Sequence, residues 1–486
     1  MGTPIPTNQA FFQALDLIQI VEGELLYGRS LFLLGSVQGV STDTRTIVPG
    51  GLFVALKGES FDGHDYLAQA EEKGARAALV EQPVDDVPGL TLMRVRSTID
   101  ALGALARAHV AQWRSRGKGD DRKIVAITGS AGKTTTRTAT AALLDRLFPD
   151  AVHATRGNLN NQVGVPMVLL GLENHKYAVV EMGMNQPGEI TSLATMAQPD
   201  VAIVTLVAAA HVEGCGSIEG VAREKGALFR ALSRDGIAVG NGDDARVVAE
   251  MESTPAARRV RYGTGDGVDL RIVERRPDGF SSSRVTLARP DGSSFWFRTP
   301  LIGEAGAYAC TAAVAAVEAL TGERMTSQVV EEAFALADVG GGGGRLVPRQ
   351  LARDVVVIDD SYNANPASSS ASIRTAAELA RDAGRRLVLV LGAMYELGHE
   401  SARGHDDVGR VAAESGAALV IAVNGDARRI ADRASEAGIP AQFFETSVDA
   451  APAAALAVQP GDLVLVKGSR GVGTERIVRT LAEVPS

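Results

Sequence analysis

The segment Thr128–Thr135, with the sequence TGSAGKTT, has the residue types and spacing needed to hold phosphate groups. Glycines in such a loop let backbone N–H groups surround phosphate oxygens, and the N-terminus of a following helix adds partial positive charge. Lys133 would neutralise the β and γ phosphates, and Thr134 would offer a hydroxyl to Mg²⁺. Ile127 replaces the glycine usual six residues before the lysine, so the loop is a shorter variant. The other loop residues expected to contact ATP are Gly129, Ser130, Ala131, Gly132 and Thr135.

Three more polar residues follow apolar runs of the same region. They are Glu181 in VVEMG, His211 in AAAHVEG and Lys225 in REKGALF. Ligands of open α/β sheets bind at the carboxyl ends of the strands, and Mg²⁺ prefers hard oxygen ligands such as Glu181. Each residue also has an ordinary interpretation, as a solvated carboxylate, a structural histidine and an exposed helical lysine. Singly, none of the three indicates a function.

The elements around the phosphate loop predict a parallel sheet. Lys123–Ile127 is a buried strand, and an Ala/Leu-rich helix runs from about Thr134 to Leu147. Helical stretches separate three further strand candidates, Tyr177–Met182, Val201–Val207 and Gly236–Val239. Such alternation is typical of parallel α/β sheets. Around Ser282–Phe297, two alternating runs joined by Arg-Pro-Asp-Gly predict an antiparallel hairpin added to the sheet.

The chain on either side of this region predicts two more domains. The first 118 residues mix helical stretches with short strand candidates and end in a Gly-rich, charged linker at 115–121. After the glycine run 340–344, four apolar runs alternate with helical segments, which predicts a doubly wound domain. We therefore expect an α/β protein of three domains, at 1–119, 120–338 and 339–486, with a central mononucleotide-binding parallel sheet and a Rossmann-like C-terminal domain.

Composition excludes several classes of protein. The 486 residues include 49 Lys plus Arg against 58 Asp plus Glu, a net charge of -9, with no basic run, so binding to nucleic acid is not expected. The two cysteines, Cys215 and Cys310, cannot form a disulfide framework, which fits a reducing compartment. The N-terminal segment is unlike a signal peptide, and the longest apolar runs are too short to span a bilayer. We expect a cytoplasmic protein.

Motifs along nearly the whole chain resemble the Mur ligase family. In the central and C-terminal regions they are TGSAGKTT at 128–135, GNLNNQVGVP at 157–166, EMG at 181–183, AAHVEGCGSIEGVAREKGALF at 209–229, DDSYNANPAS at 359–368, LGAMYELG at 391–398 and KGSRGVGTERIV at 467–478. In the N-terminal region they are STDTR at 41–45 and the segment 51–80. The stretch 243–340 matches least well.

The resemblance implies an ATP- and Mg²⁺-dependent amide ligase. Within the family, the pattern is closest to members that join D-alanyl-D-alanine to UDP-N-acetylmuramoyl-tripeptide in peptidoglycan precursor synthesis. ATP would phosphorylate the tripeptide carboxylate, and the dipeptide amine would attack the resulting acyl phosphate. The implied domains bind the UDP-substrate, ATP and the incoming dipeptide, in that order along the chain. A monomer is the implied oligomeric state.

The resemblance also implies roles for individual residues. Lys133, Glu181, His211 and Lys225 would be catalytic, and the last three, with Thr134, would hold metal, Lys225 after carbamylation. Arg345 would contact ATP phosphate, and Asp360 the nucleotide ribose. Substrate-binding candidates are Asn158, Asn160 and Asn161 in the central domain, Asn363 and Asn365 in the C-terminal domain, and Asp43, Thr44, Arg45 and Lys57 in the UDP-substrate domain. An asparagine-rich turn, and a turn before Pro366, are the structural alternatives.

Two stretches depart from the family pattern. Relatives usually carry a Gly-x-His-Asn-x-x-Asn segment whose last Asn reads adenine, but this chain has Ala305, Gly306 and Ala309 at the three polar positions. Ala393 replaces an Asp that is usual in LGAMYELG. Two alternative functions therefore stay open: a sister ligase for another amino acid, including the folylpolyglutamate type, and a non-catalytic nucleotide-binding paralogue.

Overall fold

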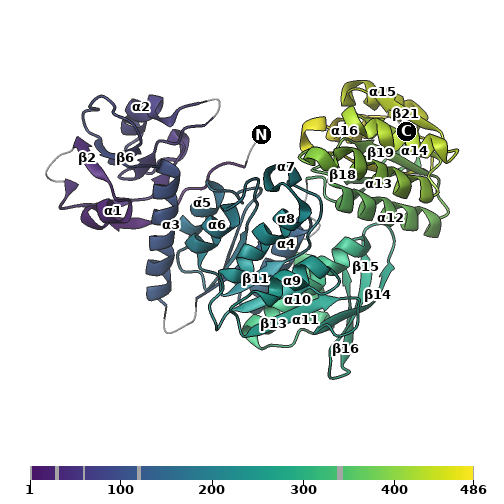
Figure 1. Cartoon of the computed structure of the whole chain (residues 1–486), viewed down its shortest axis with the longest axis horizontal. Coiled ribbons are helices and arrows are strands. Elements are labelled where there is room, and N and C mark those ends of the chain that lie inside the picture. Colours follow the sequence, from purple (N-terminus) through teal and green to yellow (C-terminus); the bar gives the residue numbers. More distant parts are fainter. Residues whose placement is uncertain (1–2, 28–31, 59–60, 118–121, 337–342, 485–486) are drawn as a thin grey trace.

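The structure is a computed structural model that describes residues 3–27, 32–58, 61–117, 122–336 and 343–484. It contains three α/β parts, and Figure 1 shows the N-terminal and C-terminal parts on opposite sides of the central one. The α/β fold class expected from the sequence is confirmed. The domain boundaries expected at 119/120 and 338/339 lie outside the described residues, as do parts of the expected linker and of the glycine run.

The N-terminal part is built on a five-stranded sheet with the order β2-β7-β6-β5-β4. Strands β4 to β7 are parallel and β2 is antiparallel to β7. In chain order the strands are β2 (Glu24–Tyr27), β4 (Val40–Ser41), β5 (Leu52–Val54), β6 (Ala77–Val80) and β7 (Thr91–Arg94), and β1 (Phe11–Gln13) pairs separately with β3 (Ser36–Gln38). The helices are α1 (Ala14–Ile20), α2 (Leu67–Glu72) and α3 (Thr98–Ser115). The strand candidates expected within the first 118 residues are therefore present.

Helix α3 joins the N-terminal part to the central part. Ser97 caps its N-terminus by accepting a hydrogen bond from the backbone N–H of Asp100. Trp113, near its other end, is fully buried and donates from its indole N–H to the carbonyl of His175 in the central part, over 3.0 Å. Because α3 also packs on two central helices, the two parts share one continuous apolar core.

The central part is a nine-stranded sheet with the order β16-β15-β14-β13-β12-β11-β8-β10-β9. Its strands are β8 (Lys123–Thr128), β9 (Val152–Ala154), β10 (Tyr177–Glu181), β11 (Val201–Val204), β12 (Ile237–Asn241), β13 (Arg258–Gly263), β14 (Leu270–Pro277), β15 (Ser283–Ala288) and β16 (Ser294–Thr299). Strands β8 to β14 pair in parallel, and β14, β15 and β16 form the antiparallel extension. The predicted parallel strands and hairpin are confirmed.

Helices cover both faces of this sheet, which is why its middle strands β10 and β11 are buried along their whole length. They are α4 (Lys133–Leu147), α5 (Gly164–Leu170), α6 (Glu189–Ala197), α7 (Val212–Cys215), α8 (Ile218–Arg230), α9 (Ala245–Glu252), α10 (Gly303–Thr321) and α11 (Ser327–Leu336). Strand β8 lies between β11 and β10, so the loop after β8 opens near the middle of the carboxyl edge. The site residues expected after β10 and β11 meet there.

The C-terminal part is a six-stranded sheet with the order β17-β18-β22-β19-β20-β21, parallel except for β17. Its strands are β17 (Val347–Gln350), β18 (Val356–Asp360), β19 (Leu387–Gly392), β20 (Leu419–Val423), β21 (Ala441–Phe444) and β22 (Leu463–Lys467). Its helices are α12 (Pro366–Asp382), α13 (Ser401–Glu414), α14 (Arg428–Glu436), α15 (Ser447–Ala457) and α16 (Glu475–Ala482). The four predicted strands form the buried middle of this doubly wound sheet.

Two expectations from composition concern the whole chain. Cys215 and Cys310 are both free thiols. In the part of the chain that the structure describes, no helix is long and apolar enough to cross a membrane.

Candidate active site

The phosphate loop has the strand–loop–helix geometry that its sequence predicts. It leaves β8 after Thr128, and α4 begins at Lys133. Gly129 and Gly132 have φ angles of +151° and +82°, in the region that favours glycine. A Cβ atom on Gly129 would lie 1.9 Å from the hydroxyl oxygen of Thr205, the residue that follows β11. That hydroxyl donates to the carbonyl of Ala131 over 2.6 Å, so the neighbouring strand end fixes the loop.

Lys133 lies at the N-terminus of α4, beside the loop. Its Nζ donates to the carbonyl of Gly129 over 2.6 Å. Burial lowers the pKa of Lys133 from its usual value, and the carboxylate of Glu181 acts in the opposite direction. Because Nζ of Lys133 lies beside the loop, it can exchange the carbonyl of Gly129 for a phosphate oxygen while it stays next to the loop.

Glu181 ends β10 with its side chain 2% exposed. One carboxylate oxygen, Oε1, accepts a hydrogen bond from Asn160 Nδ2 over 2.8 Å. The other, Oε2, has no hydrogen-bond partner in the structure and lies 3.6 Å from Nε of Arg137. An unpartnered buried carboxylate oxygen is costly and indicates a place for a cation. Arg137 was not predicted, although it follows Lys133 by one helical turn and so lies on the same face of α4.

His211 lies in the loop after β11, in a left-handed backbone conformation with φ of 59°. Its Nδ1 is 2.7 Å from Oε2 of Glu396, which belongs to the C-terminal part. The hydrogen bond and charge of His211 lower the pKa of the Glu396 carboxyl, and burial opposes the shift. Glu396 was not singled out from the sequence, because only the fold brings residues so far apart in the chain together. The pair links the central part to the C-terminal part.

Lys225 lies on α8 and is fully buried. Its Nζ has no hydrogen-bond partner in the structure. Burial, and then the charge of Lys133, lower the pKa of Lys225 well below 10.5. A buried lysine with a lowered pKa gives up its proton more readily than a free lysine, and the deprotonated amine is the form that reacts with carbon dioxide.

The residues fit a Mg²⁺ ion that arrives with a nucleotide. Such an ion keeps several waters and needs only one or two protein oxygens beside the phosphates. Oε2 of Glu181 is buried, accepts no hydrogen bond from the described residues and lies beside the guanidinium of Arg137, and Thr134 lines the same cavity. Within the described ranges, no group of three or more His, Cys, Asp and Glu side chains is placed to hold a metal without help from the nucleotide.

Two adjoining cavities open around the phosphate loop. The first, here the loop cavity, measures about 1040 Å³, and the second, the junction cavity, about 1330 Å³. The predicted site residues that line the loop cavity are Ser130, Ala131, Gly132, Lys133, Thr134, Thr135, Asn158, Asn160, Asn161, Glu181, His211, Arg345, Asp360, Asn363 and Asn365. The central and C-terminal parts contribute to both cavities, so the site lies between them.

Comparison with known proteins places the chain in a family. Three domain families match it: the Mur ligase family, catalytic domain, at residues 36–109; the Mur ligase middle domain at 127–317; and the Mur ligase, glutamate ligase domain, at 344–470. The UDP-N-acetylmuramoyl-tripeptide–D-alanyl-D-alanine ligase of Escherichia coli (strain K12) is 36% identical over 477 residues, which cover 96% of this chain and 98% of that relative. The chain belongs to the Mur ligase family.

Other relatives agree with this assignment. The ligase of the same name from Bacillus subtilis (strain 168) is 32% identical over 92% of this chain and 94% of its own length. A crystal structure of MurF from Acinetobacter baumannii superposes with a TM-score of 0.85 at 32% identity, covering 98% of this chain and all of the other. MurF of Thermotoga maritima in complex with ADP superposes with a TM-score of 0.77 at 25% identity, over 91% of this chain and 97% of that one.

In this Mur ligase, the asparagines 158, 160 and 161 have different local partners. Asn160 orients Glu181, and Asn158 accepts a hydrogen bond from the Thr3 hydroxyl over 2.7 Å. Asn161 Oδ1 accepts from the backbone N–H of Gly164 over 2.8 Å, at the start of α5. The structural alternative therefore applies to Asn161, whose side chain holds a turn.

Asn365 holds the turn before Pro366, which is the structural alternative, and its contact with substrate stays a prediction. Its Oδ1 accepts from the backbone N–H of Ser368 over 2.9 Å, as the N-cap of α12. Its Nδ2 donates to the carbonyl of Ser130 in the phosphate loop over 3.1 Å. The cap of a C-terminal helix is thus fixed directly to the loop that is expected to hold phosphate.

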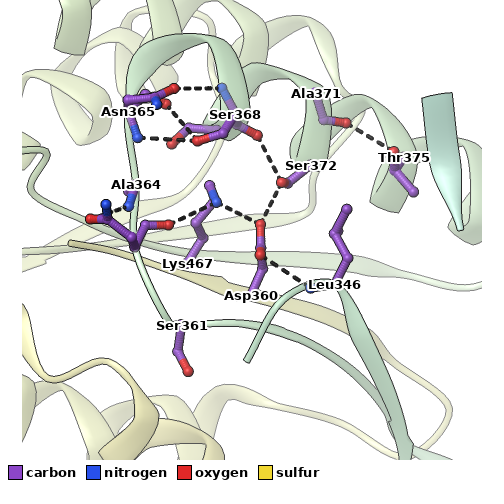
Figure 2. A network of polar contacts seen from close by, with 12 residues as sticks. Leu346, Asp360, Ser361, Ala364, Asn365, Ser368, Ala371, Ser372, Thr375 and Lys467 are labelled. Atoms are coloured by element: carbon purple, nitrogen blue, oxygen red, sulfur yellow. Dashed lines mark hydrogen bonds and ion pairs between the residues drawn. The ribbon is translucent and has the colours of Figure 1, made fainter. Parts of the chain in front are cut away.

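Asp360 is the centre of a buried polar network (Figure 2). Its Oδ2 accepts from Lys467 Nζ and from the Ser372 hydroxyl, each over 2.6 Å. Its Oδ1 accepts from the backbone N–H of Leu346 over 3.1 Å, next to Arg345. Because both carboxylate oxygens have protein partners, this Mur ligase uses Asp360 to hold the segment that carries Arg345. A contact to ribose stays a prediction, and Lys467 was not anticipated.

The four candidates of the N-terminal part lie outside both cavities. Asp43 binds the guanidinium of Arg45 with both oxygens, over 2.6 to 3.1 Å, and this pairing lowers the pKa of Asp43. The Thr44 hydroxyl donates to a glutamine side chain over 2.7 Å. Lys57 is 3.8 Å from a neighbouring aspartate. Their contact with a UDP group stays a prediction.

The start of α10 carries the departure from the family pattern. Ala305, Gly306 and Ala309 line the loop cavity, but none of them offers a polar side chain. The Tyr308 hydroxyl donates to Asp243 over 2.5 Å, and both residues line the same cavity. The polar groups at this end of the cavity therefore differ from the expected His and Asn.

Proposed function

We infer that this Mur ligase joins D-alanyl-D-alanine to UDP-N-acetylmuramoyl-tripeptide with hydrolysis of ATP to ADP and phosphate. The observation that carries the inference is the 36% identity to the Escherichia coli (strain K12) ligase of that name over almost the full length of both chains. The phosphate loop and the cavities beside it supply the site that such a reaction needs. The enzyme is an ATP-dependent carbon–nitrogen ligase that uses Mg²⁺.

The reaction brings two anions together, and the site has the charges for this. In the first step, a carboxylate oxygen of the tripeptide attacks the γ-phosphorus of ATP, which gives an acyl phosphate and ADP. Loop N–H groups and Lys133 hold the phosphates, and Arg345 faces them from the C-terminal part. Bound Mg²⁺ supplies further neutralisation of the phosphate charge, next to Thr134 and Glu181.

In the second step, the amine of D-alanyl-D-alanine attacks the acyl carbon. The amide bond forms and the C–O bond to phosphate breaks. The attacking nitrogen loses a proton as the tetrahedral intermediate collapses. Asn363 and Asn365 lie where a dipeptide from the C-terminal side would approach the phosphate loop. We propose that they help to shape its pocket.

Lys225 has the environment required for carbamylation, and we propose that it is modified. Its buried, unpartnered amine would add carbon dioxide, lose a proton and become an anion. That anion would complement His211 and Glu181 around the metal. A mass increase of one carbamate, found under native conditions and lost on acidification, would support the modification.

The two alternative functions gain less support. A folylpolyglutamate synthase of Mycobacterium tuberculosis superposes with a TM-score of 0.58 at 21% identity, which shows a shared fold alone. A paralogue without activity is suggested only by the alanines at the start of α10. Retention of the loop, Glu181, His211 and Lys225 favours an active ligase.

The experiment that tests the function measures phosphate release from ATP and UDP-N-acetylmuramoyl-tripeptide, with and without D-alanyl-D-alanine. We expect release to depend on the dipeptide and to be lost in Lys133→Ala. The exposed Lys73→Ala, in the N-terminal part, is the matched control and should leave the rate unchanged. Release that ignores the dipeptide would contradict the proposed function.

We also propose that the enzyme acts as a monomer in the cytoplasm. Residues of one chain line both cavities, so a second copy is not needed to complete them. The reaction consumes ATP, which is a cytoplasmic substrate. Sedimentation of the purified protein at assay concentration would test the oligomeric state.

A further inference from the structure

The junction cavity carries an unusual excess of positive charge. It lies where the three parts of the chain meet, between Thr3, the phosphate loop and the ends of the C-terminal strands. Among the described residues, five cationic side chains line it, against one carboxylate, and these are Lys133, Arg137, Arg156, Arg345, Arg470 and Glu396. A concave surface of this charge attracts anionic ligands.

Among these cations, Arg470 has no assigned role. It begins a short turn, Arg470–Val472, that follows the carboxyl end of β22. Within the described residues, its guanidinium forms no ion pair and no hydrogen bond. Lys133 and Arg345 are assigned to phosphate, and Arg137 lies beside Glu181. Arg470 therefore has no carboxylate partner among the described residues and lies at the C-terminal wall of the junction cavity.

The ring of Tyr362 orients Arg470 and Arg345 together. The guanidinium carbon of Arg345 is 3.9 Å from the ring centroid, and that of Arg470 is 5.1 Å from it. Cation–π contacts of this kind hold a guanidinium in place without neutralising it. The two guanidinium carbons are consequently within about 9 Å of each other. Two like charges at this separation favour an anionic ligand between or beside them.

We propose that Arg470 binds the terminal carboxylate of the incoming D-alanyl-D-alanine, an assignment that rests on the proposed function. The dipeptide is a zwitterion, and its two extended residues span at most about 7 Å. When its amine reaches the acyl carbon beside the γ-phosphate and Arg345, its carboxylate lies within reach of Arg470. A guanidinium binds a carboxylate with two parallel hydrogen bonds, which fixes the orientation of the dipeptide as well as its charge.

The other anionic substrate approaches from a different wall. UDP-N-acetylmuramoyl-tripeptide comes from the side of the N-terminal part, where Thr3, Arg156 and Asn158 line the junction cavity. Arg156 is exposed there and is the cation better placed for a carboxylate of the tripeptide. In this proposal, the carboxylate of the dipeptide and a carboxylate of the tripeptide bind different arginines, Arg470 and Arg156.

The test compares Michaelis constants of Arg470→Ala and Arg470→Lys with those of the wild type. We expect Arg470→Ala to raise KM for D-alanyl-D-alanine about 10- to 100-fold, with KM for ATP and for the UDP-tripeptide changed less than about 2-fold. Arg470→Lys, which keeps the charge but loses the second hydrogen bond, should give an intermediate KM. Arg374→Ala, at an exposed position of α12 outside both cavities, is the matched control.

A dipeptide that lacks the terminal carboxylate tests this contact directly. With D-alanyl-D-alaninamide, we expect the wild type and Arg470→Ala to have the same KM within about 2-fold, because the charge that Arg470 binds is absent from the substrate. An equal loss with dipeptide and amide, or a raised KM for the UDP-tripeptide, would overturn the assignment. If the wild type does not join the dipeptide at all, the proposed function fails as well.

Discussion

At the residue scale, the buried amine of Lys225 carries a cost in stability. Burial lowers its pKa well below 10.5, so the unfolded chain binds one more proton than the folded chain between the lowered pKa and 10.5. The folded state is therefore disfavoured in this range, and stability rises with pH toward 10.5. We predict that Lys225→Met stabilises the metal-free protein by about 1 kcal/mol or more at pH 7 while it abolishes ligation.

Urea denaturation in buffer free of carbon dioxide measures this effect. The advantage of Lys225→Met over the wild type should shrink as the pH is raised toward 10.5, because the unfolded lysine then loses its proton as well. A variant that is less stable than the wild type at pH 7 would contradict this account of the site.

Asp360 offers a second prediction at the same scale. Asp360→Ala leaves the buried ammonium of Lys467 without its carboxylate, so we expect a loss of about 3 kcal/mol in the free energy of unfolding. Adding Lys467→Met should restore most of that loss. If Asp360 also contacts the ribose, the double variant will keep a raised KM for ATP despite its recovered stability. An Asp360→Ala protein as stable as the wild type would show that the network contributes little.

Motif spacing singled out Lys133, Glu181 and His211, and the fold places them at or after the carboxyl ends of buried strands of one sheet. It could not identify Lys467 or Glu396. Lys467 contacts Asp360 across 107 positions of the chain, and Glu396 reaches His211 from another domain. Such pairs depend on how the sheets are placed relative to one another, which spacing along the chain does not encode.

At the element scale, the buried strands were predictable because helices cover both faces of each sheet. The ends of the strands were harder to predict from the sequence. The expected strand Val201–Val207 stops at Val204, and the hydroxyl of Thr205 then donates a hydrogen bond to the phosphate loop. Strands β13 and β14 were not anticipated. Each strand carries three arginines and several exposed residues, a pattern that is easily mistaken for a surface loop.

The contact between helices α8 and α6 leads to a prediction about the stability of the protein. Glu224 of α8 accepts hydrogen bonds from the backbone N–H groups of Gly188 and Ile190, over 2.9 and 2.8 Å, at the N-terminus of α6. A buried carboxylate at this position satisfies two unpaired donors and complements the helix dipole. We expect Glu224→Ala to lower the free energy of unfolding by about 1–3 kcal/mol.

Thermal or urea denaturation measures this loss, and Glu219→Ala is its control. Glu219 lies on the same helix, but its side chain is 67% exposed, so its removal should change stability by less than about 0.5 kcal/mol. Equal effects of the two substitutions would contradict the capping role of Glu224.

At the scale of the whole molecule, the strand–helix alternation and the glycine-rich segments predicted three domains but not how they share the site. The central and C-terminal parts meet at the phosphate loop, through Asn365 and Ser130 and through His211 and Glu396. The N-terminal part reaches the junction cavity with Thr3, whereas Asp43 to Arg45 lie outside both cavities. The overall charge of -9 is a poor guide to the ligands, because the cations gather around these cavities.

The central claim is that this Mur ligase activates the tripeptide carboxylate as an acyl phosphate. The most direct measurement uses UDP-N-acetylmuramoyl-tripeptide labelled with ¹⁸O in its reacting carboxylate, together with ATP and D-alanyl-D-alanine. We predict that the released phosphate carries one ¹⁸O atom, because the C–O bond to phosphate breaks when the amine attacks. Phosphate without the label, released while the amide forms, would contradict the account.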